Sequence, residues 1–213
     1  MLLPFLRIPV RHLPALGTLL ASVAAAPAAV IHVDFSGAPV IIPASFDGLY
    51  LNLVAGTLST AALPPAGWDI NPYENGTGLA FFAPATPSGQ GILASGPTAL
   101  ALLGGETIGP AGIYQPDQAL GTNFHITAIQ YAGFRFLNES TGQTNYGWLQ
   151  IRTTGGGTDP GFPASLLAYA YENTGASLTA GQIPEPSSTG LLALGLLAFA
   201  SRRHRTTPPP PDC

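Results

Sequence analysis

The chain has 213 residues, a formal net charge of −4 and only 8% charged residues, with no lysine. This length leaves room for one domain of roughly 150 residues once segments at both ends are set aside. Most arginines lie near the two ends, and the body between them contains only Arg135 and Arg152. An acidic body without a basic patch argues against nucleic-acid binding. With Cys213 as the single cysteine, an internal disulfide and a cysteine-based metal site are excluded.

Residues 1–28 have the pattern of a signal peptide. Arg7 and Arg11 precede an apolar stretch at 13–25, which leads into small residues suited to cleavage after Ala24 or Ala28. A buried core helix is the alternative interpretation, but several prolines and a glycine interrupt the segment. We therefore predict that the Sec export machinery carries the chain out of the cytoplasm and that the body begins near residue 29.

The body, residues 29–182, is predicted to consist of short strands. Its apolar runs are partly β-branched or aromatic and are separated by turns rich in Gly, Pro, Asn and Asp. No ten-residue stretch of the body combines a helical apolar stripe with an absence of Gly and Pro. We expect an all-β, antiparallel β-sandwich of the jelly-roll type. The predicted strands are residues 29–35, 49–54, 79–82, 98–103, 124–136, 146–152 and 166–172.

The longest predicted strand, 124–136, has apolar residues at every second position, which predicts one buried face and a bend near Gly133. The polar stretch that follows predicts a hairpin with 146–152. Arg135 and Arg152 lie on the two strands of this hairpin, and we expect at least one of them to pair with Glu139 or Glu172. The apolar face is expected to contain Phe124, Ile126, Ala128, Ala132, Phe134 and Phe136.

No known catalytic motif stands out in the body. The sequence lacks a G-x-S-x-G motif, a Walker loop and a dinucleotide fingerprint. His32 and His125 alternate with apolar neighbours, so we expect structural or surface histidines rather than metal ligands. A pair of carboxylates at hydrolase separation is possible in any acidic domain. We expect no catalytic residue, no metal and no cofactor; the candidate acids for a hydrolase are Asp34, Asp47, Asp69, Glu74, Asp117, Glu139, Asp159 and Glu172.

The stretch "GWDINPYENGTG", residues 67–78, is the most suggestive candidate for ligand binding. Its aromatic residues could present ring faces to the C–H groups of a sugar, while its acids and amides bond hydroxyls. The same oxygens could ligate Ca²⁺, although the spacing does not match an EF-hand loop. The plain alternative is a turn-rich connection whose aromatics pack on the core. The candidate ligand residues are Trp68, Asp69, Tyr73 and Glu74, with Asn71 and Asn75 beside them.

The C-terminal part combines three features in a fixed order. Pro184, Glu185 and Pro186 precede an apolar run at 190–200, and Arg202, Arg203 and Arg205 follow it directly. Eleven apolar residues cover about half of a 30 Å hydrocarbon core, so length alone would also suit a core helix. The arginines favour a membrane span with its basic end in the cytoplasm.

This arrangement resembles the PEP-CTERM sorting signal of Gram-negative bacteria. The stretches 131–152 and 168–187, which contain "GFRF", "YGW" and "AYE", also resemble parts of PEP-CTERM proteins. The resemblance implies processing by exosortase at the triplet Pro184, Glu185 and Pro186, with the three arginines as a cytoplasmic stop. It also implies an association with exopolysaccharide or biofilm. Residues 183–205 are thus the expected sorting signal with its transmembrane helix, and 206–213 a proline-rich cytoplasmic tail.

Taken together, these features predict a non-enzymatic protein that is anchored transiently in the membrane and then reaches the cell surface or the extracellular matrix. Its expected partners are the export machinery, an exosortase-like enzyme and an exopolysaccharide. A carbohydrate-binding module of the same fold is the alternative, and a secreted glycan hydrolase is a third hypothesis.

Overall fold

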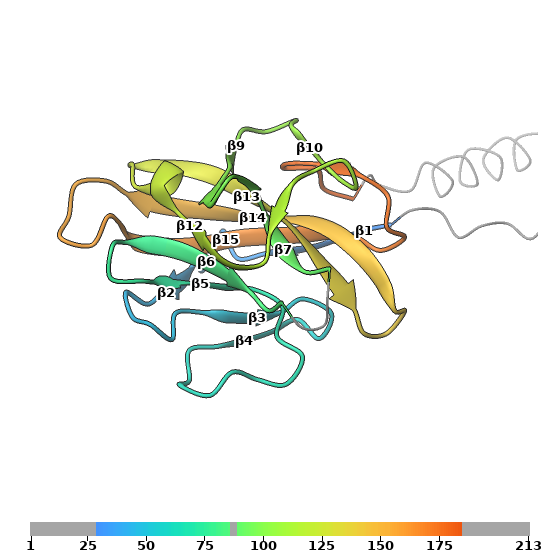
Figure 1. Cartoon of the computed structure of the whole chain (residues 1–213), viewed down its shortest axis with the longest axis horizontal. Coiled ribbons are helices and arrows are strands. Elements are labelled where there is room, and N and C mark those ends of the chain that lie inside the picture. The colour runs from blue at the N-terminus through green and yellow to red at the C-terminus, as the bar shows by residue number, and fades with distance from the viewer. Residues whose placement is uncertain (1–28, 86–88, 185–213) are drawn as a thin grey trace, which may run out of the picture.

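The computed structural model describes residues 29–85 and 89–184 (Figure 1). The predicted signal peptide lies outside the described residues, as do Glu185, Pro186, the three C-terminal arginines and the proline-rich tail. No helix within the described ranges is long and apolar enough to cross a membrane. The predicted transmembrane helix therefore stays a prediction from the sequence.

The described residues form an all-β body with one large curled sheet of twelve strands. The sheet runs β1-β15-β14-β13-β7-β8-β12-β6-β5, and β2, β9 and β11 pair at its sides. Pairing is antiparallel except between β12 and β8. The strands of this sheet are β1 (Val30–Asp34), β2 (Val40–Ile42), β5 (Asn71–Glu74), β6 (Leu79–Ala83), β7 (Gly91–Ser95), β8 (Thr98–Ala99), β9 (Ala101–Leu102), β11 (Tyr114–Gln115), β12 (Asp117–Leu120), β13 (Ala128–Asn138), β14 (Gln143–Thr154) and β15 (Gly161–Glu172).

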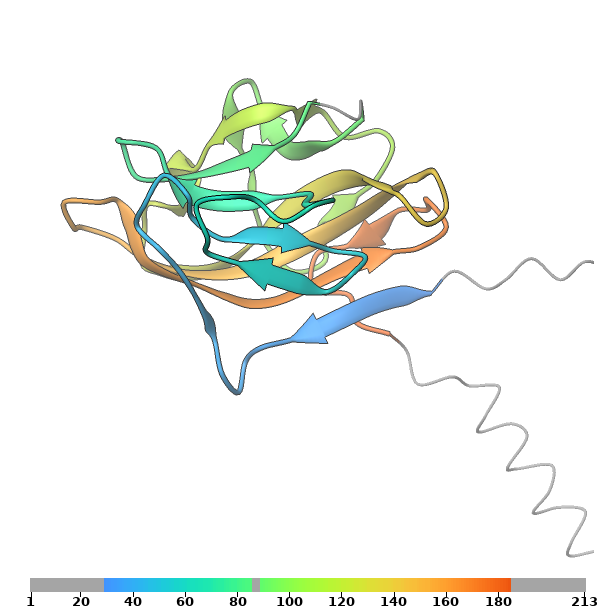
Figure 2. The same ribbon diagram turned by 90° about the horizontal axis from the view of Figure 1, so that it is seen from below.

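Two small antiparallel sheets complete the body. They pair β3 (Tyr50–Asn52) with β4 (Thr57–Ser59), and β10 (Thr107–Ile108) with β16 (Leu178–Thr179). The one helical element of the described ranges is the short 3₁₀ helix η1 (Thr122–Phe124). The predicted all-β class and antiparallel pairing are confirmed. The layers that enclose the core are two parts of one curled sheet (Figure 2).

The main core lies between the long strands β13, β14 and β15 and the strands β3, β5, β6 and β12. Fully buried aromatic rings come from both sides, and those of Phe81 and Phe124 meet edge to face, with centroids 5.0 Å apart. Burial of this apolar surface is the main favourable contribution to folding. The larger members of the core are Ile42, Leu49, Leu51, Leu53, Ile70, Leu79, Phe81, Ile92, Phe124, Phe134, Phe136, Leu149, Ile151, Phe162, Leu166, Tyr169 and Tyr171.

A second core covers the opposite face of β14 and β15. Trp148 belongs to it, whereas its neighbour Leu149 belongs to the main core. Residues on β7, β9, β10, β11 and β16 cover this face, among them Leu93, Leu102, Ile108, Tyr114 and Leu178. Since side chains alternate between the faces of a strand, burial on both faces explains why β15 and residues 146–149 of β14 are nearly continuously apolar.

The hairpin predicted from the sequence is present, but its first strand starts later than expected. β13 and β14 pair without a shift from Ala128 to Asn138, so no bulge occurs at Gly133. Phe124 belongs to η1, and Ile126 is 51% exposed, because the chain turns through η1 before β13 begins. The predicted strand 98–103 is divided between β8 and β9, which pair with different neighbours.

The expected arginine–carboxylate pairs are wrong in this body. The Arg135 guanidinium lies over the ring of Tyr114, 4.8 Å from its centroid, and Arg152 is exposed. Glu172 instead accepts hydrogen bonds from the backbone N–H groups of Thr174 and Ala176. A cation over an aromatic face replaces the predicted ion pair as the contact of Arg135.

Packing at Gly147 provides a test of the central strands. A β-carbon there would collide with the Phe134 ring and the Ala170 carbonyl, because β14 lies between β13 and β15 at this point. We expect Gly147→Ala to lower the free energy of unfolding of the full chain by about 1–3 kcal/mol in denaturant titrations. Gly37→Ala is the control, since a β-carbon at Gly37 meets nothing within 4 Å. Equal stability of the two variants would contradict the described packing.

Candidate functional site

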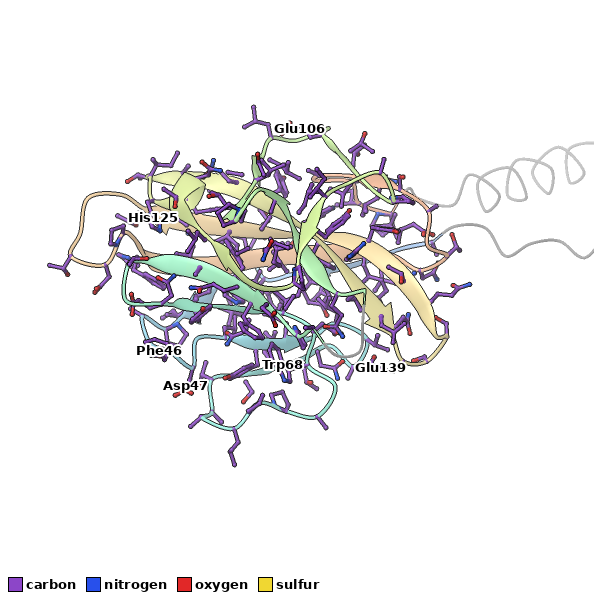
Figure 3. The ribbon with its side chains drawn as sticks, in the orientation of Figure 1. Phe46, Asp47, Trp68, Glu106, His125 and Glu139 are labelled. Carbon is purple, nitrogen blue, oxygen red and sulfur yellow. The ribbon has the colours of Figure 1, made fainter. Side chains whose placement is uncertain are left out.

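A pocket lined by aromatic residues lies where β3, β5 and β6 meet the loops that lead into them. Its volume is about 330 Å³, and we call it the aromatic pocket. Figure 3 shows Phe46 on the loop before β3 and Trp68 on the same side of the molecule. The lining residues are Phe46, Tyr50, Trp68, Asn71, Tyr73 and Phe82.

Strand alternation places these side chains together. Leu49 and Leu51 enter the main core, so Tyr50 between them faces the opposite side. Asn71 and Tyr73 are two residues apart on β5, and Phe82 is the partner of Asn71 on β6. The two strands therefore present these three side chains on one face of the sheet.

Gly48 lets the loop before β3 lie directly against β5. Its φ is +53°, and a β-carbon would collide with Pro72, Tyr73 and the side chain of Asn71. Backbone hydrogen bonds fasten the contact, because the Leu49 N–H donates to the Pro72 carbonyl at 3.0 Å. Phe46 is thereby held at the pocket although its side chain is 72% exposed.

The rings form a connected lining. Trp68 lies edge to face with Tyr50 at a centroid distance of 5.1 Å, and its centroid is 5.8 Å from that of Phe82. Phe46 and Tyr73 form a second pair at 6.2 Å. Such pairs stabilise one another by about 0.5–1.5 kcal/mol beyond the burial of their area, which keeps the rings in place.

Asn71 supplies an unpaired polar atom at this pocket. Its side chain is 4% exposed, and its Oδ1 has no hydrogen-bond partner among the described residues. A buried acceptor without a partner costs about 1–3 kcal/mol, and a ligand hydroxyl would recover that energy if the amide rotates away from Gly48 toward the pocket. The arrangement is therefore suited to hold a small polar molecule that also has apolar faces.

The phenols of the aromatic pocket remain neutral at physiological pH. Burial raises the pKa of Tyr50, and the charge of Asp47 adds to this. Burial likewise raises the pKa of Tyr73, with a smaller contribution from Glu74. Both hydroxyls are thus available as hydrogen-bond donors.

The structure separates the four candidate ligand residues. Trp68 and Tyr73 line the aromatic pocket, but Asp69 is fully buried on the core side, where its Oδ2 accepts the Leu53 N–H at 2.8 Å. Glu74 accepts the N–H groups of Gly76 and Gly78 and closes a turn. The alternative of a turn-rich connection is incomplete, because residues 71–74 are the strand β5.

Sequence reasoning missed Phe46, Tyr50 and Phe82 as pocket residues. Tyr50 and Phe82 each alternate with core residues, and this pattern could have indicated a second aromatic face. Phe46 gave no local signal, since it reaches the pocket through the close approach of the loop at Gly48.

Other candidate groups have structural contacts. The His125 Nε2 lies 3.1 Å from the Leu79 carbonyl oxygen, and the His32 ring packs 5.7 Å from that of Trp148. Asp34 accepts the Ser36 N–H, and Glu172 accepts the Thr174 and Ala176 N–H groups. Within residues 29–85 and 89–184 no group of three or more His, Cys, Asp or Glu could hold a metal ion.

A wider hollow of about 700 Å³ lies beside β7, β8 and β9. Glu106 is its one charged lining residue, and its carboxylate is already bonded to the backbone. No aromatic side chain lines it. The aromatic pocket is therefore the better candidate site.

Comparison with known protein families identifies one segment. Residues 182–205 match the PEP-CTERM protein-sorting motif. No curated protein and no solved structure matches the chain. The motif implies export, membrane-associated sorting and processing by exosortase.

Asp69 makes stability depend on pH. Burial raises the pKa of its carboxyl from 3.8 to about 7, the Leu53 N–H opposes this, and nearby Glu139 adds to it. The unfolded chain releases the proton near pH 4 and the folded chain near pH 7, so stability falls as pH rises between these values and then levels off. We expect Asp69→Asn to remove this decline, a difference on the order of a few kcal/mol. Denaturant titrations of the full chain from pH 4 to 8 would measure it.

The control for this experiment is Asp159→Asn at an exposed aspartate. It should keep the decline of the wild-type chain. If Asp69→Asn and the wild-type chain differ by the same amount at every pH, the assignment to Asp69 is wrong.

Proposed function

Because the chain carries a PEP-CTERM sorting motif at residues 182–205, we propose that it is a non-catalytic protein of the cell surface or extracellular matrix that associates with exopolysaccharide. The observation that carries the proposal is the match of this motif immediately after a folded body. β16 ends at Thr179, and Gln182 is still tied to the body, since its N–H donates to the Thr179 carbonyl.

The arrangement of the ends supports the proposal. The chain enters the body at β1 and leaves it after β16 on the same side (Figures 1 and 2). Ala29 and Asn173 are joined by hydrogen bonds in both directions, which fixes the entry point beside the final segment. A body held near the membrane by its C-terminal signal would thus present its opposite side outward.

Four of the body's acidic residues have structural contacts, which supports a non-catalytic body. Asp34, Glu74, Glu106 and Glu172 each accept backbone N–H groups of nearby residues and so close turns. A hydrolase needs a pair of free carboxylates that face a cleft. The alternative of a carbohydrate-binding module is favoured by a different observation, the aromatic pocket, and is compatible with a matrix protein.

Processing in the native host tests the proposal. In the proposed sorting mechanism the processing enzyme recognises Glu185, and the three arginines keep the C-terminal end of the chain at the cytoplasmic face of the membrane. We expect mass spectrometry of the surface-exposed protein to find no peptide reaching Cys213. Glu185→Gln and the triple substitution of Arg202, Arg203 and Arg205 by Gln should each leave unprocessed chain in the membrane fraction.

The matched control is Glu139→Gln, which removes the same charge from an exposed position in the body. It should be processed like the wild-type chain. A surface form that retains its C-terminal peptide would contradict sorting, and equal recovery from the matrix of a host unable to make exopolysaccharide would contradict the proposed association.

A further inference from the structure

We propose that the aromatic pocket binds an uncharged pyranose unit of a polysaccharide. The inference deepens the proposed function, since it names the site and the ligand class by which the body would hold an exopolysaccharide. It is carried by the geometry of the pocket, whether or not the sorting signal acts as proposed.

The aromatic lining suits the apolar faces of a sugar. The C–H groups of a pyranose ring carry slight positive charge, and aromatic faces are their natural counterpart because the π-system is negative above the ring. The side chain of Phe46 is 72% exposed, and Trp68 and Phe82 are partly exposed, so ring surface is open to a ligand. A volume of about 330 Å³ lies at the lower end of the range of small-ligand pockets, about 300–1,000 Å³.

Polar groups complement the hydroxyls. The Asn71 side chain is more than nine-tenths buried, and its Oδ1 is without a partner among the described residues. A sugar hydroxyl can donate to it once the amide has rotated away from Gly48, and the neutral phenols of Tyr50 and Tyr73 can donate in return. A purely apolar occupant, such as a hydrophobic side chain of another protein, would leave the amide oxygen unpaired.

The charges around the pocket exclude an anionic sugar. None of the six lining residues is charged. Burial is the larger cause of the raised pKa of Tyr50 and Tyr73, and the negative charges of Asp47 and Glu74 near the pocket add to it. A uronate or sulfate would meet these charges without a cation to pair with, which costs binding energy. No carboxylate is among the six lining residues to pair with a cationic ligand, and the nearby Glu74 is already bonded to Gly76 and Gly78.

The rigid position of the lining distinguishes the pocket from a scattered apolar surface. Tyr50, Asn71, Tyr73 and Phe82 lie on strands, and Phe46 is fixed by the close loop at Gly48. Side chains on strands keep the geometry of a site more precisely than those on loops. The strand residues of the lining therefore need little reorganisation when the ligand enters, whereas Trp68 lies on the loop before β5.

Binding can be measured with the full chain purified in mild detergent. In native affinity electrophoresis, the gel contains dextran, hydroxyethylcellulose or galactomannan as uncharged probes and alginate as an anionic probe. We expect at least one uncharged probe to retard the protein and alginate not to do so. The Trp68 fluorescence should change with the same probe, and this change can be followed in Trp148→Phe, which removes the other tryptophan.

Three variants locate the site. Phe46→Ala and Trp68→Ala should each weaken binding at least tenfold, and Asn71→Ala about fivefold. Asn71→Ala removes an unpaired buried acceptor, so its thermal unfolding temperature should be equal to or above that of the wild-type chain, which separates a binding role from a structural one. Leu103→Ala is the control, because Leu103 is 69% exposed and lies beside Glu106, on the side of the molecule away from Phe46 (Figure 3).

Each contrary result would overturn a specific part of the sugar-binding proposal. If none of the uncharged probes retards the protein, the proposed binding site is wrong. The same holds if Trp68→Ala and Phe46→Ala both leave binding unchanged. Alginate binding that is lost in Trp68→Ala overturns the ligand class. If no probe retards the protein but the chain self-associates, and Phe46→Ala abolishes this self-association, the pocket is an interface between copies of the chain and the sugar proposal is wrong. If the chain is sorted normally but binds no probe, the sugar-binding proposal is wrong while the proposed cell-surface location still stands. The two proposals can therefore be tested independently.

Discussion

Burial of the β14 strand on both faces is the constraint on which the body depends. Leu149 and Ile151 fill the main core, and Trp148 fills the second core on the other side. The strand can lie this close to its neighbours only because Gly147 leaves room for the Phe134 ring. Both faces of the sheet are therefore covered at its centre, and the remaining strands form the two layers that cover these faces.

The strands that cover the two faces of β14 have different roles. On one face, β10 and β16 close the second core, and the chain leaves the body directly afterwards toward the sorting motif. On the other face, β3, β5 and β6 bury leucine and phenylalanine inward and present Tyr50, Tyr73 and Phe82 to the aromatic pocket. Strand alternation around the main core thus positions three of the pocket's rings, whereas Phe46 and Trp68 come from loops.

The sequence predicted the parts of this body that depend on local pattern. The strands at 146–152 and 166–172 and their hairpin partner are predicted correctly because apolar runs rich in aromatic residues allow few alternatives. Short strands such as β5 and β12 were not found, since their pairing depends on residues far away in the chain. The candidate stretch at 67–78 was partly right: Trp68 and Tyr73 line the pocket, whereas the inward turn of Asp69 reflects the core beneath it. Phe46 could not be predicted, because its place depends on the close approach of the loop at Gly48.

Residue-resolved hydrogen exchange of the full chain, with and without an uncharged polysaccharide, tests this account most directly. Without ligand, the amides of β14 should be the slowest to exchange, since β14 is paired with a strand on each edge and is buried on both faces. With ligand, added protection should be confined to 45–52 and 68–83, the segments that form the aromatic pocket. Exchange in β14 as fast as in the β3–β4 hairpin, or added protection centred on other segments, would contradict the account.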